Sequence, residues 1–175
     1  MTNHFFGLDS NQRADIFCAL VKRGNSKVFH MFSDIPDFFK EIPIQNRVVQ
    51  IFLDAIKHGN YSFFVEKIYS RFTFESIINI DKNDRLLVLH AAVSSGVFEL
   101  VKFFLISDFA KDFESTDASL QDIYVAAIEI GNKDINDLLK KYLPRPNSNE
   151  KILEAKKKSQ FNRVFKMNIG DMRSI

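Results

Sequence analysis

The chain has 175 residues and a mass of 20.3 kDa, with 46% hydrophobic and 26% charged residues, so it can bury the core of one ordinary domain. Its single cysteine, Cys18, excludes an internal disulfide and favours a reducing compartment. The net charge of +2 is uneven, because residues 151–175 carry +5 and residues 1–150 carry −3. No stretch approaches the roughly 20 apolar residues of a membrane span. No basic, apolar leader is visible at the N-terminus, so we expect a cytoplasmic location.

Four segments of the chain align on a glycine and indicate an internal repeat. The glycines are separated by 35, 37 and 35 residues in a chain that has only six. Each segment opens with a large apolar residue seven positions before its glycine, and small or apolar residues such as Ala19, Ala55, Ala92 and Ala127 follow. The segments are Phe17–Gly24, Phe52–Gly59, Leu89–Gly96 and Tyr124–Gly131. We interpret each as a helix that ends at a glycine in the left-handed conformation.

A second amphipathic run follows each glycine. Apolar residues spaced by three and four predict a second helix around 28–32, 63–68, 100–105 and 135–139. Asp15 and Asp122 stand two residues before the opening aromatic residue, where we expect them to accept from free backbone N–H groups at helix starts. Each unit is thus predicted to be a helix, a tight turn and a second helix. Because such a pair cannot bury its apolar face alone, neighbouring pairs are expected to stack.

The third unit closely resembles an ankyrin repeat. It reads Leu89-His-Ala-Ala-x-x-x-Gly96-x-x-Glu-Leu-Val-Lys-Phe-Phe-Leu105, which is similar to the family's Thr-Pro-Leu-His-x-Ala-Ala followed by a glycine and an apolar second helix. The resemblance covers about residues 12–143. It implies an all-α, ankyrin-like solenoid of about four helix-turn-helix repeats, and a structural role for His90. The family's Thr-Pro pair and its Gly-Ala-Asp-x-Asn turn are missing, so loops or extra helical turns could replace its β-hairpin fingers.

The segments outside the repeats are set off by a proline-containing break. The predicted division is an N-terminal extension at 1–11, repeats at about 12–45, 46–81, 82–117 and 118–143, a linker at 144–149, and a basic amphipathic helix and tail at 150–175. In that last helix Leu153, Phe161, Val164 and Phe165 fall near one apolar stripe.

The role of the basic tail stays open at this point. It could cap the open end of the solenoid, since terminal repeats need a polar outer face. It could instead dock on an acidic protein surface or be recognised as a delivery signal. Nucleic acid or an anionic membrane is disfavoured, because the body of the chain is acidic and only three lysines are consecutive. The candidate contact residues are Lys156, Lys157, Lys158, Phe161 and Phe165.

No sequence motif indicates catalysis. The chain lacks a cysteine pair, a His-Glu-x-x-His motif and a calcium-binding Asp-x-Asp-x-Asp-Gly loop, and its glycines are too dispersed for a phosphate-binding loop. We therefore expect no enzymatic activity, no metal and no cofactor.

A stack of helix pairs presents a surface, so function is expected on its exposed side chains. Residues just before each glycine should face the concave side, and Asp84 should flank them on a loop. The candidate contact residues are Lys22, Arg23, Lys57, His58, Ser94, Ser95, Glu129 and Ile130. They run from basic to acidic along the chain and favour a protein–protein interaction module.

Two other hypotheses stay open. The chain could be an effector of an intracellular bacterium or a virus, secreted into a host cell with its tail as the delivery signal. It could also be a structural subunit of an assembly. The sequence identifies neither the partner nor the oligomeric state.

Overall fold

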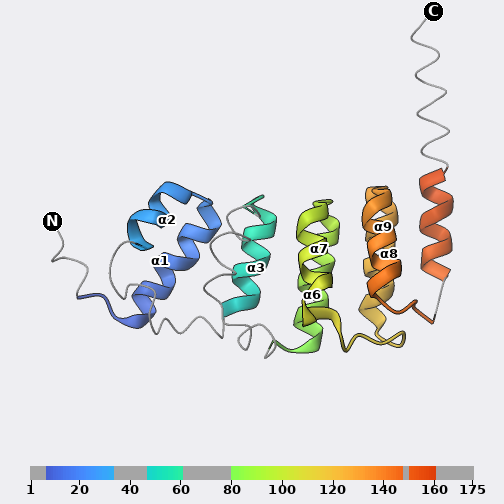
Figure 1. Ribbon diagram of the computed structural model, residues 1–175, viewed down its shortest axis with the longest axis horizontal. Helices are drawn as coiled ribbons and strands as arrows, with labels where there is room; N and C mark the ends of the chain where they lie inside the picture. Colours follow the sequence, from blue (N-terminus) through green and yellow to red (C-terminus); the bar gives the residue numbers. More distant parts are fainter. Residues whose placement is uncertain (1–6, 34–46, 61–79, 148–149, 161–175) are drawn as a thin grey trace, which may run out of the picture. The chain divides into compact units, whose positions relative to one another are not determined.

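A computed structural model describes residues 7–33, 47–60, 80–147 and 150–160 (Figure 1). Helices and turns account for the regular structure of these residues, and no strand occurs among them. The protein is therefore all-α, as predicted. The chain forms two compact units, Met1–Ile80 and Asp81–Ile175.

The first unit contains α1 (Ser10–Arg23), α2 (Ser26–Ser33) and α3 (Val48–Lys57), and α1 packs against α3. The start of α1 lies within the segment predicted as an N-terminal extension. Asp9 caps it, because its side chain accepts from the N–H of Gln12 at 2.8 Å while the Gln12 side chain accepts from the N–H of Asp9 at 3.0 Å. The predicted second helix around 28–32 is found as α2, and the one around 63–68 lies outside the described residues.

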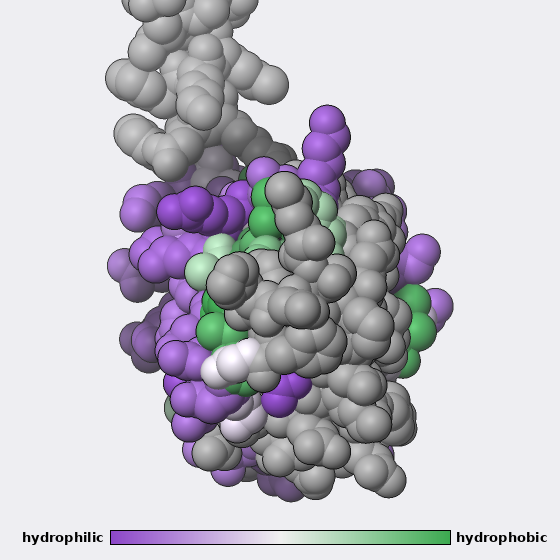
Figure 2. Space-filling model, turned by 90° about the vertical axis from the view of Figure 1, so that its left-hand side faces the viewer, coloured by the Kyte–Doolittle hydropathy of each residue, from purple (hydrophilic) through white to green (hydrophobic). Residues whose placement is uncertain are grey.

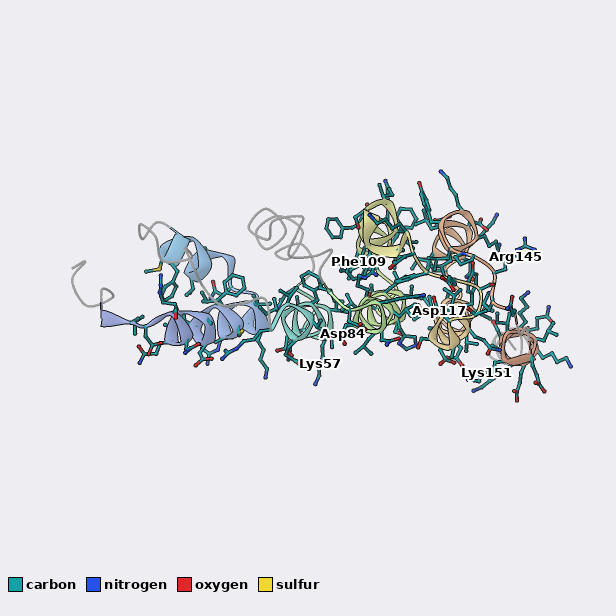
Figure 3. The ribbon with its side chains drawn as sticks, turned by 90° about the horizontal axis from the view of Figure 1, so that it is seen from below. Lys57, Asp84, Phe109, Asp117, Arg145 and Lys151 are labelled. Carbon is teal, nitrogen blue, oxygen red and sulfur yellow. The ribbon has the colours of Figure 1, made fainter. Side chains whose placement is uncertain are left out.

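The second unit contains two stacked helix pairs. The first pair is α6 (Lys82–Ser94) with α7 (Phe98–Ile106), and the second is α8 (Ala118–Ile130) with α9 (Lys133–Tyr142). The first helices α6 and α8 pack against each other, as do the second helices α7 and α9. Figure 3 shows α6 and α8 in one row and α7 and α9 in the other, with a further helix at 150–160 following α8.

The four aligned glycines occupy equivalent positions in these helices. Gly24, Gly59, Gly96 and Gly131 have φ angles of 61°, 70°, 70° and 72°, so each takes the left-handed conformation predicted for it. The residues seven positions before them are all buried, and so are the residues four positions before them. Those two sets are Phe17, Phe52, Leu89 and Tyr124, and Leu20, Ala55, Ala92 and Ala127. The repeat that the spacing predicted is thus present in the backbone and in the core.

The predicted helix starts were wrong at Asp15 and Asp122. Both residues lie inside helices, because α1 and α8 begin at Ser10 and Ala118, more than a full turn earlier than the apolar segments suggested. Asp15 instead pairs with Arg47 at the start of α3. Ala19 was also misplaced, since it is exposed whereas Ala14 supplies the buried small residue of α1.

A strap of irregular chain, residues 107–117, connects the two pairs of the second unit. It contains the short 3-10 helix η4 (Asp108–Ala110) and turns, and no strand forms in this strap. Phe109 and Phe113 anchor the strap in the core at 2% and 6% exposure. The buried Arg85 of α6 holds it by donating to the carbonyl of Phe109 at 2.7 Å and to the Asp112 carboxylate at 2.6 Å.

The helix at 150–160 continues the row of first helices. Lys151 pairs with Asp122 of α8 at 3.0 Å, and Ile152 and Ala155 are buried at 7% and 6% exposure. The predicted apolar stripe was therefore wrong at Leu153, which is 55% exposed because Ile152 and Ala155, three residues apart, form the inner face. Phe161, Val164 and Phe165 lie outside the described residues.

Candidate partner-binding surface

In the first unit, the candidate residues lie at the C-terminal ends of α1 and α3. Lys22 and Arg23 end α1, Lys57 and His58 end α3, and all four are exposed. Cations are favourable there, because the carbonyl end of a helix carries partial negative charge. Lys22, Arg23 and Lys57 form no ion pair with another described residue.

Asn60 joins these two helix ends. Its side-chain Nδ2 donates to the carbonyls of Val21 at 2.9 Å and Lys22 at 3.2 Å, so the turn after α3 satisfies the last carbonyls of α1. An added Cβ at Gly24 would lie 1.8 Å from the Asn60 Oδ1. The cationic residues of α1 and α3 are therefore held on one closely packed edge. Figure 2 views the molecule from the side on which α1 lies; hydrophilic side chains gather on one side of this view, and apolar ones form small patches.

In the second unit, the candidate residues lie at the ends of α6 and α8. Ser94, Ser95, Glu129 and Ile130 are all exposed. The side chain of Ile130 approaches the preceding turn, with its Cγ2 atom 3.4 Å from the position that a Cβ would take at Gly96. The Ser95 hydroxyl is already used within the fold, because it donates to the Ala92 carbonyl at 2.6 Å and accepts from the Val97 N–H at 3.3 Å.

Asp84 was expected on a loop, but it lies in the first turn of α6, where its carboxylate is exposed. Sequence analysis missed Leu87, one turn further along α6, which is 49% exposed. A signal was present, because Leu87 occupies the position that Asp15 and Asp122 hold in other repeats. An exposed apolar residue at a position that is polar in the other segments is therefore a candidate contact residue.

The exposed face of α6 and α8 therefore combines two apolar side chains with acidic ones. Leu87 and Ile130 supply the apolar surface at 49% and 42% exposure. Asp84 and Glu129 are exposed carboxylates on the same helices. The face thus presents exposed apolar and acidic side chains, which are both components of protein-binding surfaces.

The tail residues Lys156, Lys157 and Lys158 are exposed on the helix at 150–160. Phe161 and Phe165 lie outside the described residues. The buried Ile152 and Ala155 of this helix show that it covers apolar surface of the second unit.

The shifted pKa values of the titratable side chains arise from burial and from contacts within the fold. The hydrogen bond from Arg85 holds the pKa of Asp112 below its usual value. Burial tends to raise the pKa of Asp117, but the N–H of Glu114 and the Lys82 ammonium, 2.9 Å away, outweigh it and the pKa is lowered. Burial raises the pKa of the Cys18 thiol, which is the opposite of what a nucleophilic cysteine needs.

Within the described residues, no cluster of three or more His, Cys, Asp or Glu side chains is placed to hold a metal ion. His90 is half-buried on α6 and forms no hydrogen bond to another residue of the described ranges. No helix in the described part of the chain has the length and apolar character needed to cross a bilayer.

In comparisons with known proteins, no family model, no curated protein and no solved structure matched this chain.

Proposed function

We propose that this chain is a protein-binding module, and that its helix pairs form an ankyrin-like solenoid which recruits a partner protein through the exposed faces of the first helices. Support for the solenoid comes from the shared register of the four glycines and from the stacked pairs α6–α7 and α8–α9. The resemblance of Leu89–Leu105 to an ankyrin repeat points the same way.

The observation that carries the binding function is the exposure of side chains that the fold does not use. Lys22, Arg23 and Lys57 project from helix ends without an ion pair among the described residues. Leu87 and Ile130 expose apolar surface that solvent does not stabilise. Charged residues of this kind steer a partner and fix its orientation, and apolar residues supply the anchoring contacts.

A charge-reversal experiment tests this surface. The full chain and the variant Lys22→Glu/Arg23→Glu/Lys57→Glu are used as baits, and the captured proteins are compared by mass spectrometry. The matched control, Lys27→Glu/Lys102→Glu/Lys141→Glu, makes the same change in net charge at exposed positions of the second helices.

We expect the first variant to lose the captured partner and the control to keep it, with both variants keeping the circular dichroism spectrum of the unchanged chain. A partner captured equally well by all three baits would contradict the proposed surface.

A further inference from the structure

A groove runs along the second unit between α9 and the helix at 150–160. Tyr124 and Ile128 of α8 form its floor, and Ile152, Leu153 and Pro146 add apolar walls around a cavity of about 390 Å³. A second hollow of about 450 Å³ shares Ile128, Asn136, Lys140 and Lys156 with the first and continues toward Gly131 and Ser159. The two hollows therefore form one continuous groove with an apolar floor.

The border of this groove is strongly cationic. Lys133 and Lys140 project from α9, Arg145 comes from the following loop, and Lys156 comes from the facing helix. Figure 3 shows Arg145 at the outer side of α9. The one carboxylate in the lining, Asp137, pairs with Lys140 at 2.8 Å. A net positive charge over an apolar floor calls for an occupant that is amphipathic and acidic.

The position of the groove in the stack indicates what shape that occupant has. In the two helix pairs of the second unit, α7 packs on α6 and α9 packs on α8. The helix at 150–160 lies beside α8 as the next first helix, yet no helix of the described ranges packs on it as a second helix. Leu153, at 55% exposure, lines the place where such a helix would lie.

We propose that this groove binds an acidic amphipathic helix of a partner protein, which packs on the helix at 150–160 as α9 packs on α8. The length of α9, 10 residues, sets the expected contact at about three turns, or roughly 15 Å. Apolar residues of the bound helix at i, i+3, i+4 and i+7 contact Ile128, Ile152 and Leu153. Its Glu or Asp side chains meet Lys140, Arg145 and Lys156.

Charge argues against this chain's own C-terminus as the occupant. Residues 161–175 carry three Lys or Arg residues and a single Asp, so they match the groove in sign. This site is separate from the first-helix surface, and its test is independent of that proposal.

The test uses the full chain and a defined peptide probe. The probe is a fluorescein-labelled peptide of about 14 residues, four helical turns, with Leu at i, i+3, i+4 and i+7 and Glu elsewhere. A second peptide carries Lys in place of every Glu. Binding is measured by fluorescence anisotropy at low salt and again at about 0.15 M salt. We expect the acidic peptide to bind more tightly than the basic one by at least tenfold.

Variants then locate the binding. Lys140→Glu/Lys156→Glu is expected to weaken binding of the acidic peptide at least tenfold. Leu153→Ala is expected to weaken it several-fold, because Leu153 lines the groove. This exposed leucine can be removed without unfolding the chain. The matched control Lys27→Glu/Lys102→Glu, at two exposed residues that do not line the groove, should stay within twofold of the unchanged chain. Lys22→Glu/Arg23→Glu/Lys57→Glu should also leave peptide binding unchanged.

Three results would overturn the proposal. The first is equal binding of the two peptides, or binding of the acidic peptide that Lys140→Glu/Lys156→Glu does not weaken. The second is that the acidic peptide does not bind and that residues 161–175 are protected from hydrogen exchange, with Lys140→Glu/Lys156→Glu removing the protection. That result would place the chain's own C-terminus in the groove. The third is a concentration-dependent dimer in sedimentation that the variant abolishes, which would place a second copy there.

Discussion

Replacement of Arg85 by methionine tests how the irregular strap at 107–117 is held. Arg85 is 6% exposed, and its guanidinium donates to the Phe109 carbonyl at 2.7 Å and to Asp112 at 2.6 Å. It also lies 5.6 Å from the centre of the Phe113 ring. Methionine keeps most of the apolar stem and removes every one of these polar contacts. The variant therefore isolates the polar attachment of the strap from its packing.

The expected loss follows from the burial of each partner. The Phe109 carbonyl is buried and left without its donor, which costs about 1–3 kcal/mol. The Asp112 side chain is 50% exposed, so water replaces much of its ion pair and the loss is no more than about 1 kcal/mol. The contact with the Phe113 ring adds about 0.5–1 kcal/mol. We expect Arg85→Met to lower the free energy of unfolding by about 1.5–5 kcal/mol in total.

The assay is urea unfolding at 25 °C followed by circular dichroism, with Asp112→Asn as the matched variant. Asp112→Asn removes the charge alone and should cost no more than about 1 kcal/mol. A loss below about 0.5 kcal/mol for Arg85→Met would refute the reasoning, because a buried carbonyl cannot lose its donor at so small a cost. Equal losses for the two variants would also refute it, since the ion pair would then carry the whole effect.

The same pair predicts a pH dependence. Because Arg85 lowers the pKa of Asp112 in the folded state, the unfolded chain takes up the proton first as the pH falls. The contribution of Asp112 is complete above its unfolded pKa of about 4 and is lost as the pH falls through the lower folded value. The stability difference between the unchanged chain and Asp112→Asn should therefore shrink between about pH 5 and pH 3. A difference that grows in this range would contradict the sign of the shift.

Three smaller sets of substitutions test other parts of the fold, each by the same urea unfolding. Gly24→Ala should lower the free energy of unfolding more than Gly59→Ala, because both glycines have positive φ but only a Cβ at Gly24 would meet the Asn60 side chain. Gly59→Ala alone should cost about 1–2 kcal/mol. Equal losses for the two variants would show that the Asn60 side chain moves away freely. Tyr124→Phe should cost about 0.5–1.5 kcal/mol, because the buried hydroxyl donates to carbonyls at the end of α9, 3.2 and 3.3 Å away, and no loss would mean that these carbonyls find other donors. Asp9→Ala should cost about 1 kcal/mol by removing the cap of α1, whereas Asp9→Asn should cost much less, and similar losses would point to charge instead of capping.

The sequence predicts the helices and their repeat well, because both depend on local spacing. Gly24 and Gly131 end their helices as expected, since a left-handed residue after an amphipathic run is a local signal. The helix starts at Asp15 and Asp122 were wrong for the same reason. A carboxylate near an aromatic residue looks like a cap, but Asp9, with Gln12 three residues later, supplies the cap of α1.

Features that depend on contacts between distant residues could not be predicted. Arg85 and Asp112 are 27 residues apart, and nothing in their local sequence pairs them. The periodicity at 150–160 predicted an apolar stripe through Leu153, but the buried side chains are Ile152 and Ala155, and only the packing of the helix decides this. The same packing decides which residues of a helix remain exposed to a partner.

Asn60 has a consequence for how the first unit folds. Its side chain supplies donors to the carbonyls of Val21 and Lys22, so the last turn of α1 is completed by a residue that follows α3 in the chain. The dependence between the two helices therefore runs in one direction, because loss of order after α3 frays the C-terminal end of α1. Amide exchange that starts at Asn60 should spread to the C-terminal turn of α1, while fraying at Asp9 should leave the α3 turn protected. Helices α1 and α3, joined in this way, behave as one cooperative segment, in which the end of α1 depends on a residue synthesised after α3.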